Sequence, residues 1–524
     1  MSQILCQFTN LTQQFDQRTL FAALSGTLST GLTGLVGRNG QGKSVLLTIL
    51  SHAQLPTTGS VSWSADFHRL NQLERLAGPR LADALGIGDL YDCFQRIQLG
   101  DMQAGDLDRV DGLWHLPAEW EQLLASAALS NDLSAPVEQL SGGEQTRLAL
   151  CRAFLNRTPY LLLDEPSNHL DRDGRDWLID RLTKHAGGAL IVTHDRELLA
   201  KVDRILELSE QGLTEYGGNY DIYQSIRSAQ LNAVEQQLAH LEKTKRQQLS
   251  LQQASLEKSA QRKKQGEQQR RTGSQSKLLM DAKQNRAEGS LGKLKQAHQQ
   301  RNSQLQTELK TAQATVEQLK VQALYTSAPP NRSGLRIHIT ELCLPYGHQE
   351  PISLTVQSGE HWHIGGGNGS GKSTLLKILA GLEKPRSGTC DVHGNCVYLD
   401  QHFSLLDPAR SALENLQDRH PDRTESSLRT ELAGLRLIGD KALTPVAHLS
   451  GGERLKVALI ATLTESETHT PDILLLDEPD NHLDLDSKQL LEKTLVAYTG
   501  TLLVVSHDIS FVEALNIQHQ LSLQ

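Results

Sequence analysis

Gly37-Arg-Asn-Gly-Gln-Gly-Lys-Ser44 lies between an apolar run at Leu32–Val36 and a helical pattern at Val45–Leu50. It matches G-x-x-x-x-G-K-[ST], the pattern of a loop whose backbone N–H groups surround nucleotide phosphates at the start of a helix. Gly366-Gly-Asn-Gly-Ser-Gly-Lys-Ser373 repeats the pattern in the same setting. Because both matches have the expected strand and helix beside them, coincidence explains them poorly. The chain is expected to contain two nucleotide-binding modules.

A longer repeat surrounds these two loops. Each copy has a β-rich start, an apolar strand and a helix around the loop, and two later apolar strands that end in polar residues. The paired stretches are Ile4–Phe8 and Leu335–Ile339, Leu32–Val36 and His361–Ile364, Val45–Leu50 and Thr374–Leu379, Tyr160–Glu165 and Ile473–Glu478, and Ala189–His194 and Leu502–His507. Uninterrupted apolar strands suit a sheet covered on both faces, so the predicted fold class is α/β.

Length and composition place limits on the kind of protein. A chain of 524 residues predicts two or more domains. The sequence has no apolar run near the ~18 residues of a membrane span, and its first residues do not resemble a secretory signal. The six cysteines are scattered without a C-x-x-C pair, which favours reduced thiols over a zinc site. A cytoplasmic protein without a membrane segment is expected.

The net charge of −9 is unevenly distributed. Residues 225–322 hold 18 Lys and Arg against 8 Asp and Glu, whereas the rest of the chain holds 34 against 53. A polyanionic partner would therefore be attracted to the middle of the chain and repelled by its flanks.

The middle segment has the pattern of paired helices. Two runs at 3/4 spacing fit coiled-coil seams, namely Leu231, Val234, Leu238 and Leu241, then Leu305, Leu309, Ala312, Val316 and Leu319. The simplest interpretation is two antiparallel helices with a tip near Arg270–Asp281, ended by Pro329 and Pro330. A disordered Gln/Lys-rich tether is the alternative. The predicted domains are 1–224, 225–330 and 331–524.

The two loops predict the groups that hold a nucleotide and its metal ion. Lys43 and Lys372 would place a point charge on the β- and γ-phosphates, and Ser44 and Ser373 would supply a hydroxyl to Mg²⁺. The residues assigned to nucleotide binding are Gly37, Arg38, Asn39, Gly40, Gln41, Gly42, Lys43 and Ser44, with Gly366, Gly367, Asn368, Gly369, Ser370, Gly371, Lys372 and Ser373.

Paired carboxylates follow the apolar strands. Asp164 and Asp477 are placed to hold the Mg²⁺ shell, and the adjacent Glu165 and Glu478 to polarise the attacking water as general bases. Helix capping would explain one such pair. It does not explain the same Asp-Glu-Pro in both copies.

Leu140-Ser-Gly-Gly-Glu-Gln145 and Leu449-Ser-Gly-Gly-Glu-Arg454 resemble the signature motif of ATP-binding-cassette ATPases, and the order of motifs matches that family in both copies. The resemblance implies two ATP-binding-cassette nucleotide-binding domains with ATP and Mg²⁺ as cofactors. It also implies Q-loop glutamines at Gln72 and Gln401, which touch Mg²⁺, and switch histidines at His194 and His507, which contact the γ-phosphate. Phe15 and Tyr346 would stack on adenine or simply pack in the core.

In that family the signature of one domain closes the ATP site of the other. One implied site joins the loop at Gly37 to Ser450, Gly451 and Gly452, and the other joins the loop at Gly366 to Ser141, Gly142 and Gly143. Cassette pairing within a single chain is therefore expected, which is compatible with a monomer.

The narrower resemblance is to the ABC-F group, which has two cassettes, a helical hairpin linker and no membrane domain. Ser167-Asn-His-Leu-Asp171, Asp480-Asn-His-Leu-Asp484 and Tyr216-Gly-Gly-Asn-Tyr220 carry it. It implies a translation factor or an antibiotic target-protection protein on the ribosome, with the linker directed at P-site tRNA and the peptidyl-transferase centre. Arg262, Lys263, Lys264, Arg270 and Arg271 are the candidate RNA contacts, because basic side chains neutralise phosphates.

Four departures from the group's pattern stand out. Asp480 replaces the usual Thr and adds a negative charge beside Glu478. Residues 464–470 resemble an insertion, nothing between Gln72 and Leu140 resembles a long charged arm, and no C-terminal coiled coil is expected after His507. Two alternatives stay open, the ATPase subunit of a membrane exporter and a DNA-repair ATPase. The first leaves the basic linker without a role, and the second lacks C-x-x-C hooks.

Overall fold

The computed structural model describes residues 3–15, 18–70, 76, 78–156, 158–168, 170–271, 296, 299–313, 315–316, 324, 334–463, 471–481 and 483–523. The chain forms two compact units. One unit consists of Met1–Ile222 with Gln322–Gln524, and the other of Tyr223–Val321. The first unit contains both copies of the repeat, and the second contains most of the basic segment. The domain limits at residues 224 and 330 stay predictions.

The first cassette is built around a six-stranded sheet. Its order is β5 (Phe67–Leu70), β6 (Tyr160–Asp164), β7 (Gly188–Val192), β3 (Gly31–Val36), β8 (Arg204–Ser209) and β9 (Gly212–Gly217). Only the β8–β9 pair is antiparallel, and every residue of β6 and β7 is buried. The predicted doubly covered strands are confirmed.

A second, antiparallel sheet covers the helix that follows the phosphate loop. It consists of β2 (Arg18–Ser29), β1 (Ile4–Phe15) and β4 (Thr58–Trp63). Leu46, Leu47, Ile49 and Leu50 of α1 (Lys43–Leu50) pack between side chains of both sheets, such as Phe8 and Leu35. The apolar face of α1 therefore holds the loop before it in place.

The second cassette repeats this arrangement. Its parallel sheet has the order β14 (Cys396–Leu399), β15 (Ile473–Asp477), β16 (Thr501–Val505), β12 (His361–Gly366) and β17 (His519–Leu523). Its antiparallel sheet has the order β11 (Ile352–Gln357), β10 (Leu335–Cys343) and β13 (Ser387–Val392), and α11 (Lys372–Leu379) packs between the two sheets. The predicted α/β fold with an internal repeat is confirmed.

Each cassette also has a helical part. The first contains α2 (Leu81–Ala84), α3 (Gly88–Leu99), α4 (Asp106–Val110), α5 (Leu116–Ser126), α6 (Gly142–Leu155), α7 (Arg172–Thr183) and α8 (Arg196–Leu199). The second contains α12 (Ala412–Arg419), α13 (Glu425–Gly434), α14 (Asp440–Leu443), α15 (Gly451–Leu463), α16 (Leu485–Ala497) and α17 (Ile509–Ala514). Short 3₁₀ turns at Val137–Gln139 and Val446–His448 precede α6 and α15.

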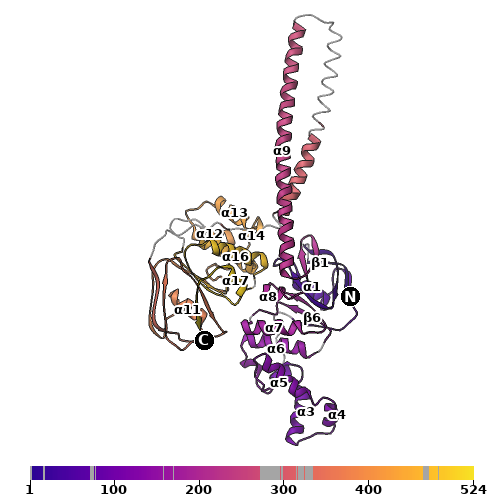
Figure 1. Ribbon diagram of the computed structural model, residues 1–524, viewed down its shortest axis with the longest axis vertical. Coiled ribbons are helices and arrows are strands. Elements are labelled where there is room, and N and C mark those ends of the chain that lie inside the picture. The colour runs from indigo at the N-terminus through magenta and orange to yellow at the C-terminus, as the bar shows by residue number, and fades with distance from the viewer. Residues whose placement is uncertain are drawn as a thin grey trace. The chain divides into compact units, whose positions relative to one another are not determined.

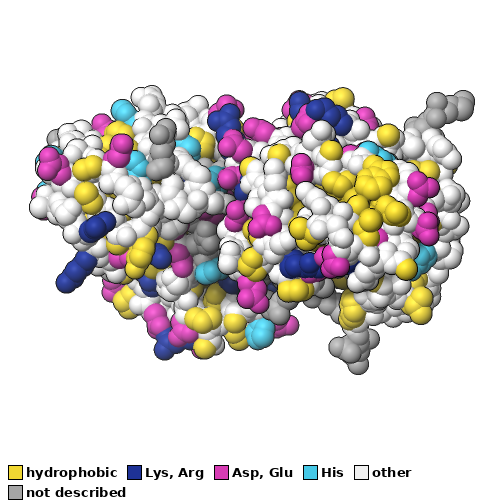
Figure 2. All heavy atoms as spheres, turned by 90° about the horizontal axis from the view of Figure 1, so that it is seen from below, with side chains coloured by type: hydrophobic (Ala, Val, Ile, Leu, Met, Phe, Trp, Pro, Cys, Tyr) yellow, Lys and Arg dark blue, Asp and Glu magenta, His cyan; other side chains and the backbone are white. Residues whose placement is uncertain are grey.

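The first cassette has additional residues in its helical part. Residues 71–140 lie between β5 and the signature, against 400–449 in the second cassette. Within the described residues of that segment the longest helix is α3, with 12 residues, so they form a short helical pair and no long arm. Figure 2 looks onto the end that carries α3 and α4, where apolar side chains gather. Leu99 of α3, Leu107 of α4 and Met102 between these helices are exposed.

The second unit is a helical hairpin. α9 (Tyr220–Arg271) has 52 residues and starts before the predicted linker limit of residue 225. Helical residues 299–313 lie beside it (Figure 1). Leu241 packs with Leu305, Leu309 and Ala312. This packing confirms the paired-helix interpretation over the tether. The predicted tip beyond Arg271, Pro329 and Pro330, and the 464–470 stretch lie outside the described residues.

Among the described residues, no helix combines the length and the apolar character needed to cross a membrane.

The hairpin seam gives a first prediction. Leu309→Asn puts an unpaired amide into the seam and removes buried apolar surface, at a cost of about 2 kcal/mol or more in local stability. Amide hydrogen exchange should speed up around Leu241 on the facing helix. Thr307→Asn, at an exposed position two residues before Leu309 and on the opposite face of the helix, is the control. If the rate of amide hydrogen exchange around Leu241 did not change in the Leu309→Asn variant, the packing of the two helices along this seam would be contradicted.

Candidate active site

The predicted functional groups meet at one edge of each parallel sheet. In the first cassette β6, β7 and β3 are neighbours, and their carboxyl ends lead to Glu165, to His194 and to the phosphate loop. In the second, β15, β16 and β12 place Glu478, His507 and the second loop in the same way. Ligands of α/β sheets bind outside the carboxyl ends of the strands. Each cassette thus has one candidate site.

Backbone geometry fixes the start of each phosphate loop. Gly37 has φ 148°, and a Cβ there would lie 2.4 Å from the carbonyl oxygen of Leu208. Gly366 has φ 150°, and its Cβ would lie 2.4 Å from the carbonyl oxygen of Leu523. Only glycine fits both the dihedral and the space. Each loop is therefore held tightly against the strand beside it.

The two loop lysines lie along their own loops. Lys43 Nζ donates to the carbonyls of Gly37 at 2.7 Å and Arg38 at 3.1 Å, and Lys372 Nζ does the same to Gly366 at 2.9 Å and Gly367 at 2.7 Å. Both side chains are buried, and burial lowers the pKa of each ammonium while nearby carboxylates oppose the shift. A triphosphate would offer these buried cations the anion that they lack.

Carboxylates and hydroxyls suited to Mg²⁺ lie beside the loops. Ser373 Oγ donates to Asp477 Oδ1 at 3.0 Å, and Tyr398 donates to Asp477 Oδ2 at 2.9 Å. In the first cassette, burial raises the pKa of Asp164, and its Oδ1 is buried without a hydrogen-bond partner among the described residues. An orphaned carboxylate oxygen next to a serine hydroxyl fits a hard divalent cation.

The glutamine positions differ in what the structure describes. Gln401 Nε2 donates to Glu478 Oε2 at 2.7 Å, and Asn481 donates to the same oxygen. Gln401 therefore lies at the second site, in contact with the predicted base. Gln72 lies outside the described residues.

The glutamates predicted to act as bases have an unusual backbone. Glu165 and Glu478 both have φ 49°, in the left-handed region that non-glycine residues rarely adopt. The N–H of Glu165 donates to the Val192 carbonyl and that of Glu478 to the Val505 carbonyl, each at 2.9 Å. These bonds tie each glutamate to the neighbouring strand and compensate the strain, which costs of order 1 kcal/mol or more and concentrates at functional sites.

Each glutamate faces its histidine. His194 Nε2 lies 3.5 Å from Glu165 Oε1, and His507 Nε2 lies 3.7 Å from Glu478 Oε1. Burial raises the pKa of Glu165 to about 7 and lowers the pKa of His507 to about 4. Burial also raises the pKa of Glu478 and lowers that of His194. Neutral imidazoles beside carboxyls with raised pKa values are suited to proton transfer near neutral pH.

The first site includes residues of the second cassette. A cleft of about 560 Å³ is lined by Asn39, Lys43, Asp164, Glu165 and His194, and also by Gly451 of the second signature. Asn39 N donates to Asp484 Oδ2 at 2.9 Å, and Arg38 Nε lies 2.9 Å from Asp486 Oδ2. The structure thus brings the first loop and the second signature together. Phe15 also lines the cleft, whereas Tyr346 is 72% exposed.

The first signature is more exposed than the second. Ser141 and Gly142 of the first signature are exposed, whereas Ser450 is half-buried and Gly452 buried. In both signatures the serine and the glutamate three residues later form a capping box at the start of α6 and α15. The serine N–H donates to the glutamate Oε2 at 2.8 and 3.0 Å, and the serine Oγ accepts from the glutamate N–H at 3.4 Å in each. The two candidate sites therefore differ in their surroundings.

Sequence reasoning assigned no role to four residues of these sites. Tyr398 and Asn481 bind the carboxylates of the second site, and Asp484 and Asp486 bind the loop of the first. Asp484 ends the repeated Asn-His-Leu-Asp stretch, which was a signal for it. Asn481 begins the same stretch, whereas Tyr398 and Asp486 had no pattern of their own.

Comparison with known proteins agrees with this geometry. The sequence matches the ABC transporter family over residues 22–168 and 349–481. It is 32% identical to the probable ATP-binding protein YheS of Escherichia coli (strain K12), over 96% of this chain and 76% of that protein. It is 36% identical to the putative ATP-binding protein YdiF of Bacillus subtilis (strain 168), over 73% of this chain and only 54% of that one.

A third relative is the ribosome protection protein VmlR of Bacillus subtilis (strain 168), 29% identical over 96% of this chain and 84% of its own length. Among solved structures, an RNase-L inhibitor has the same fold, with a TM-score of 0.54 and 20% identity over 97% of this chain and 86% of its own. Fold, site and matches together define an ATP-binding-cassette ATPase. Within that class, the chain belongs to the ABC-F family.

The pKa of Glu165 predicts a pH-dependent stability. Below its ordinary value of 4.5 the carboxyl is protonated in both folded and unfolded chains, so burial costs nothing. Between 4.5 and about 7 the unfolded chain ionises first, and above about 7 the penalty is complete, on the order of 3 kcal/mol. Glu165→Gln should therefore raise the first calorimetric unfolding temperature at pH 8 and not at pH 4.

The measurement is made without nucleotide or divalent cations. Glu210→Gln, at an exposed position, should leave the unfolding temperature unchanged at both pH values. An equal effect of Glu165→Gln at pH 4 and pH 8 would show that burial does not control this carboxyl.

Proposed function

We propose that this ATPase acts on the ribosome and uses ATP to control the helical hairpin between its cassettes. The observation that carries the proposal is the shared cleft, where the first phosphate loop and Gly451 of the other cassette line the same space. ATP bound there would contact both cassettes and hold them closed. Hydrolysis would remove the γ-phosphate and release them.

The proposed roles of the site residues follow from their positions in the structure, except for Gln72, whose role follows from the sequence alone. Lys43 and Lys372 bind the phosphates, and Ser44, Asp164, Ser373 and Asp477 hold Mg²⁺ with Gln72 and Gln401 near it. Glu165 and Glu478 polarise the attacking water, oriented by His194 and His507. Bound Mg²⁺ supplies charge stabilisation to the β- and γ-phosphates. The signature N–H groups at the starts of α6 and α15 offer an anion site to the γ-phosphate.

Two observations support the ribosome as the partner. The relative VmlR, which is called a ribosome protection protein, is similar along 96% of this chain. The basic excess of residues 225–322 provides an attraction for RNA. We propose that the hairpin reaches P-site tRNA and the peptidyl-transferase centre in the cytoplasm, in a translation or antibiotic target-protection role, with the chain acting as a monomer.

Trapping the ATP-bound form tests this function. Glu165→Gln combined with Glu478→Gln removes both proposed bases, so ATP should remain bound and the protein should sediment with ribosomes in an ATP-dependent way. ATPase activity should fall by roughly 10²-fold or more. The control Lys43→Ala with Lys372→Ala should bind neither ATP nor ribosomes. Wild-type turnover in the glutamine variant would disprove the base assignment, and recovery with membranes instead of ribosomes would favour an exporter.

Salt titration tests the linker's part. Alanine replacement of Arg262, Lys263, Lys264, Arg270 and Arg271 should reduce the slope of log affinity against log salt by up to roughly 4, because fewer counterions are released. A matched control replaces five exposed lysines outside the linker, Lys184, Lys201, Lys377, Lys384 and Lys493. Ribosome binding that is insensitive to salt, or equally reduced slopes for both variants, would count against the linker as the RNA contact.

A further inference from the structure

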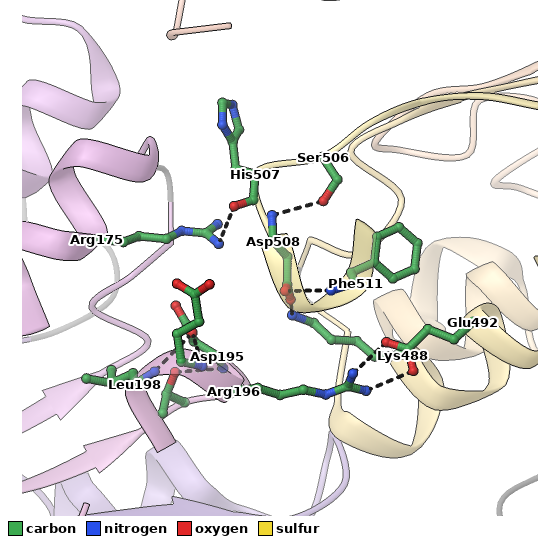
Figure 3. Close-up of polar contacts among 12 residues, drawn as sticks. Arg175, Asp195, Arg196, Leu198, Lys488, Glu492, Ser506, His507, Asp508 and Phe511 are labelled. Atoms are coloured by element: carbon green, nitrogen blue, oxygen red, sulfur yellow. Dashed lines mark hydrogen bonds and ion pairs between the residues drawn. The ribbon is translucent and has the colours of Figure 1, made fainter. Parts of the chain in front are cut away.

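One buried ion pair joins the two cassettes away from the ATP cleft. Arg196 Nη1 donates to Glu492 Oε1 at 2.6 Å, and Arg196 Nη2 donates to Glu492 Oε2 at 3.1 Å (Figure 3). Both side chains are only 12% exposed. A paired fork of this kind is geometrically specific, and separating it would leave a buried charge on each side. Arg196 and Glu492 should therefore move together.

Arg196 belongs to the same short segment as the switch histidine of the first site. His194 precedes it by two residues, and Asp195 caps α8 by accepting from the N–H groups of Glu197 at 3.0 Å and Leu198 at 3.2 Å. Because the cap fixes the turn between them, we expect a displacement of His194 to move Arg196 as well. The ion pair thus connects the first ATP site to α16 of the other cassette.

The other neighbour of Arg196 is the first residue of the long helix α9. The guanidinium lies 6.0 Å from the ring centroid of Tyr220, which is 5% exposed. Asn219 Nδ2 donates to the Ala200 carbonyl at 3.4 Å, directly after α8. The foot of α9 is therefore attached to the segment that follows His194. A cation above an aromatic ring attracts it by up to about 2 kcal/mol where water is excluded.

α16 also reaches the switch segment of its own cassette. Lys488, one turn before Glu492, donates to Asp508 Oδ2 at 2.7 Å, and Arg175 of the first cassette donates to the His507 carbonyl at 3.2 Å. Burial alone would lower the pKa of Lys488, but Asp508 and Asp480 outweigh it and the pKa is raised. One helix thus contacts the residues that follow both switch histidines (Figure 3).

The Arg196–Glu492 ion pair has no counterpart at the equivalent positions of the other repeat copy. Counting from the switch histidines, the position of Arg196 corresponds to Ile509 in the second cassette. Counting from Asp171 and Asp484, the position of Glu492 corresponds to Ile179 in the first. The sequence therefore provides the charged pair on the side from which α9 departs, and two isoleucines on the other.

We propose that Arg196 is the positioning residue that couples closure of the first ATP site to the orientation of α9. When the cassettes close on ATP, Glu492 and the segment after His194 move together as one body. Arg196 belongs to that body and transfers its movement to Tyr220 at the foot of the helix. Arg196 touches neither nucleotide nor metal. The inference rests on the proposed function only in taking the hairpin as the part that acts on the partner.

Spin-label distances test the coupling without ribosomes. Labels at Asn131 and Gln247, both exposed, report the hairpin relative to the first cassette, and labels at Asn131 and Asp422 report cassette closure. The half-buried Cys343, Cys390 and Cys396 are first replaced by serine, and the Glu165→Gln, Glu478→Gln background traps ATP. In the parent, ATP should shift both distance distributions.

Arg196→Met should keep the Asn131–Asp422 shift and lose the Asn131–Gln247 shift. The double variant Arg196→Met, Glu492→Met removes both charges, so neither partner is left as an unpaired buried ion. It should give the same two results as the single Arg196→Met variant. Arg196→Lys keeps a cation beside Glu492 and Tyr220 and should retain the ATP-dependent Asn131–Gln247 shift. Arg80→Met breaks another forked pair of the same cassette, to Asp83 and Asp92, and should change nothing. Without the glutamine substitutions, basal ATPase should stay within about twofold of the parent.

An ATP-dependent hairpin shift that persists in both methionine variants would overturn the inference, as would a parent whose hairpin does not respond to ATP. The ribosome proposal and the coupling can fail independently of each other. If the trapped parent fails to sediment with ribosomes while its hairpin shift depends on Arg196, the ribosome proposal fails and the coupling stands.

Discussion

The chain depends on one geometric constraint, the close approach of each phosphate loop to the strand beside it. At Gly37 and Gly366 the space that a side chain would need is filled by a backbone carbonyl. The loop can follow this path only because the next helix is packed between two sheets by its apolar face. Loop, carboxylates and histidine then meet at one edge, since their strands are neighbours in a parallel sheet.

Burial determines the chemistry available at that edge. Removing carboxyls and lysines from water makes their charged forms costly, which raises the pKa of Glu165 and Glu478 and lowers that of Lys43 and Lys372. A nucleotide with its metal ion would supply the missing counter-charges. The same logic applies where the cassettes meet, because Lys488, Asp508, Arg196 and Glu492 are charged groups that burial forces into pairs. The need to pair buried charges therefore shapes both the ATP sites and the contact between the two cassettes.

Much of the site was predictable because its parts are repeated. Asp164 and Asp477, or His194 and His507, stand at matching places after apolar strands, and these strands are neighbours in a parallel sheet in each cassette. Tyr398 and Glu492 were not predictable, because a single tyrosine or glutamate has no pattern that distinguishes a ligand from a solvated side chain. Asp480 is an intermediate case. Its place beside Glu478 was expected from the sequence, and its charge contributes to the raised pKa of Glu478, but its proximity to Lys488 had no local pattern.

The sequence by itself determined the two cassettes, the strands and loops that form each site, and the basic hairpin between them. Periodicity and turn chemistry are local, so they can be read from neighbouring residues. The tertiary structure alone decided which groups meet across the cassettes, such as Asn39 with Asp484 and Arg196 with Glu492. Those partners are hundreds of residues apart, and their pairing depends on how two independently built surfaces fit together. Within the first cassette, the local fold places Tyr220, the foot of the hairpin, beside the same Arg196.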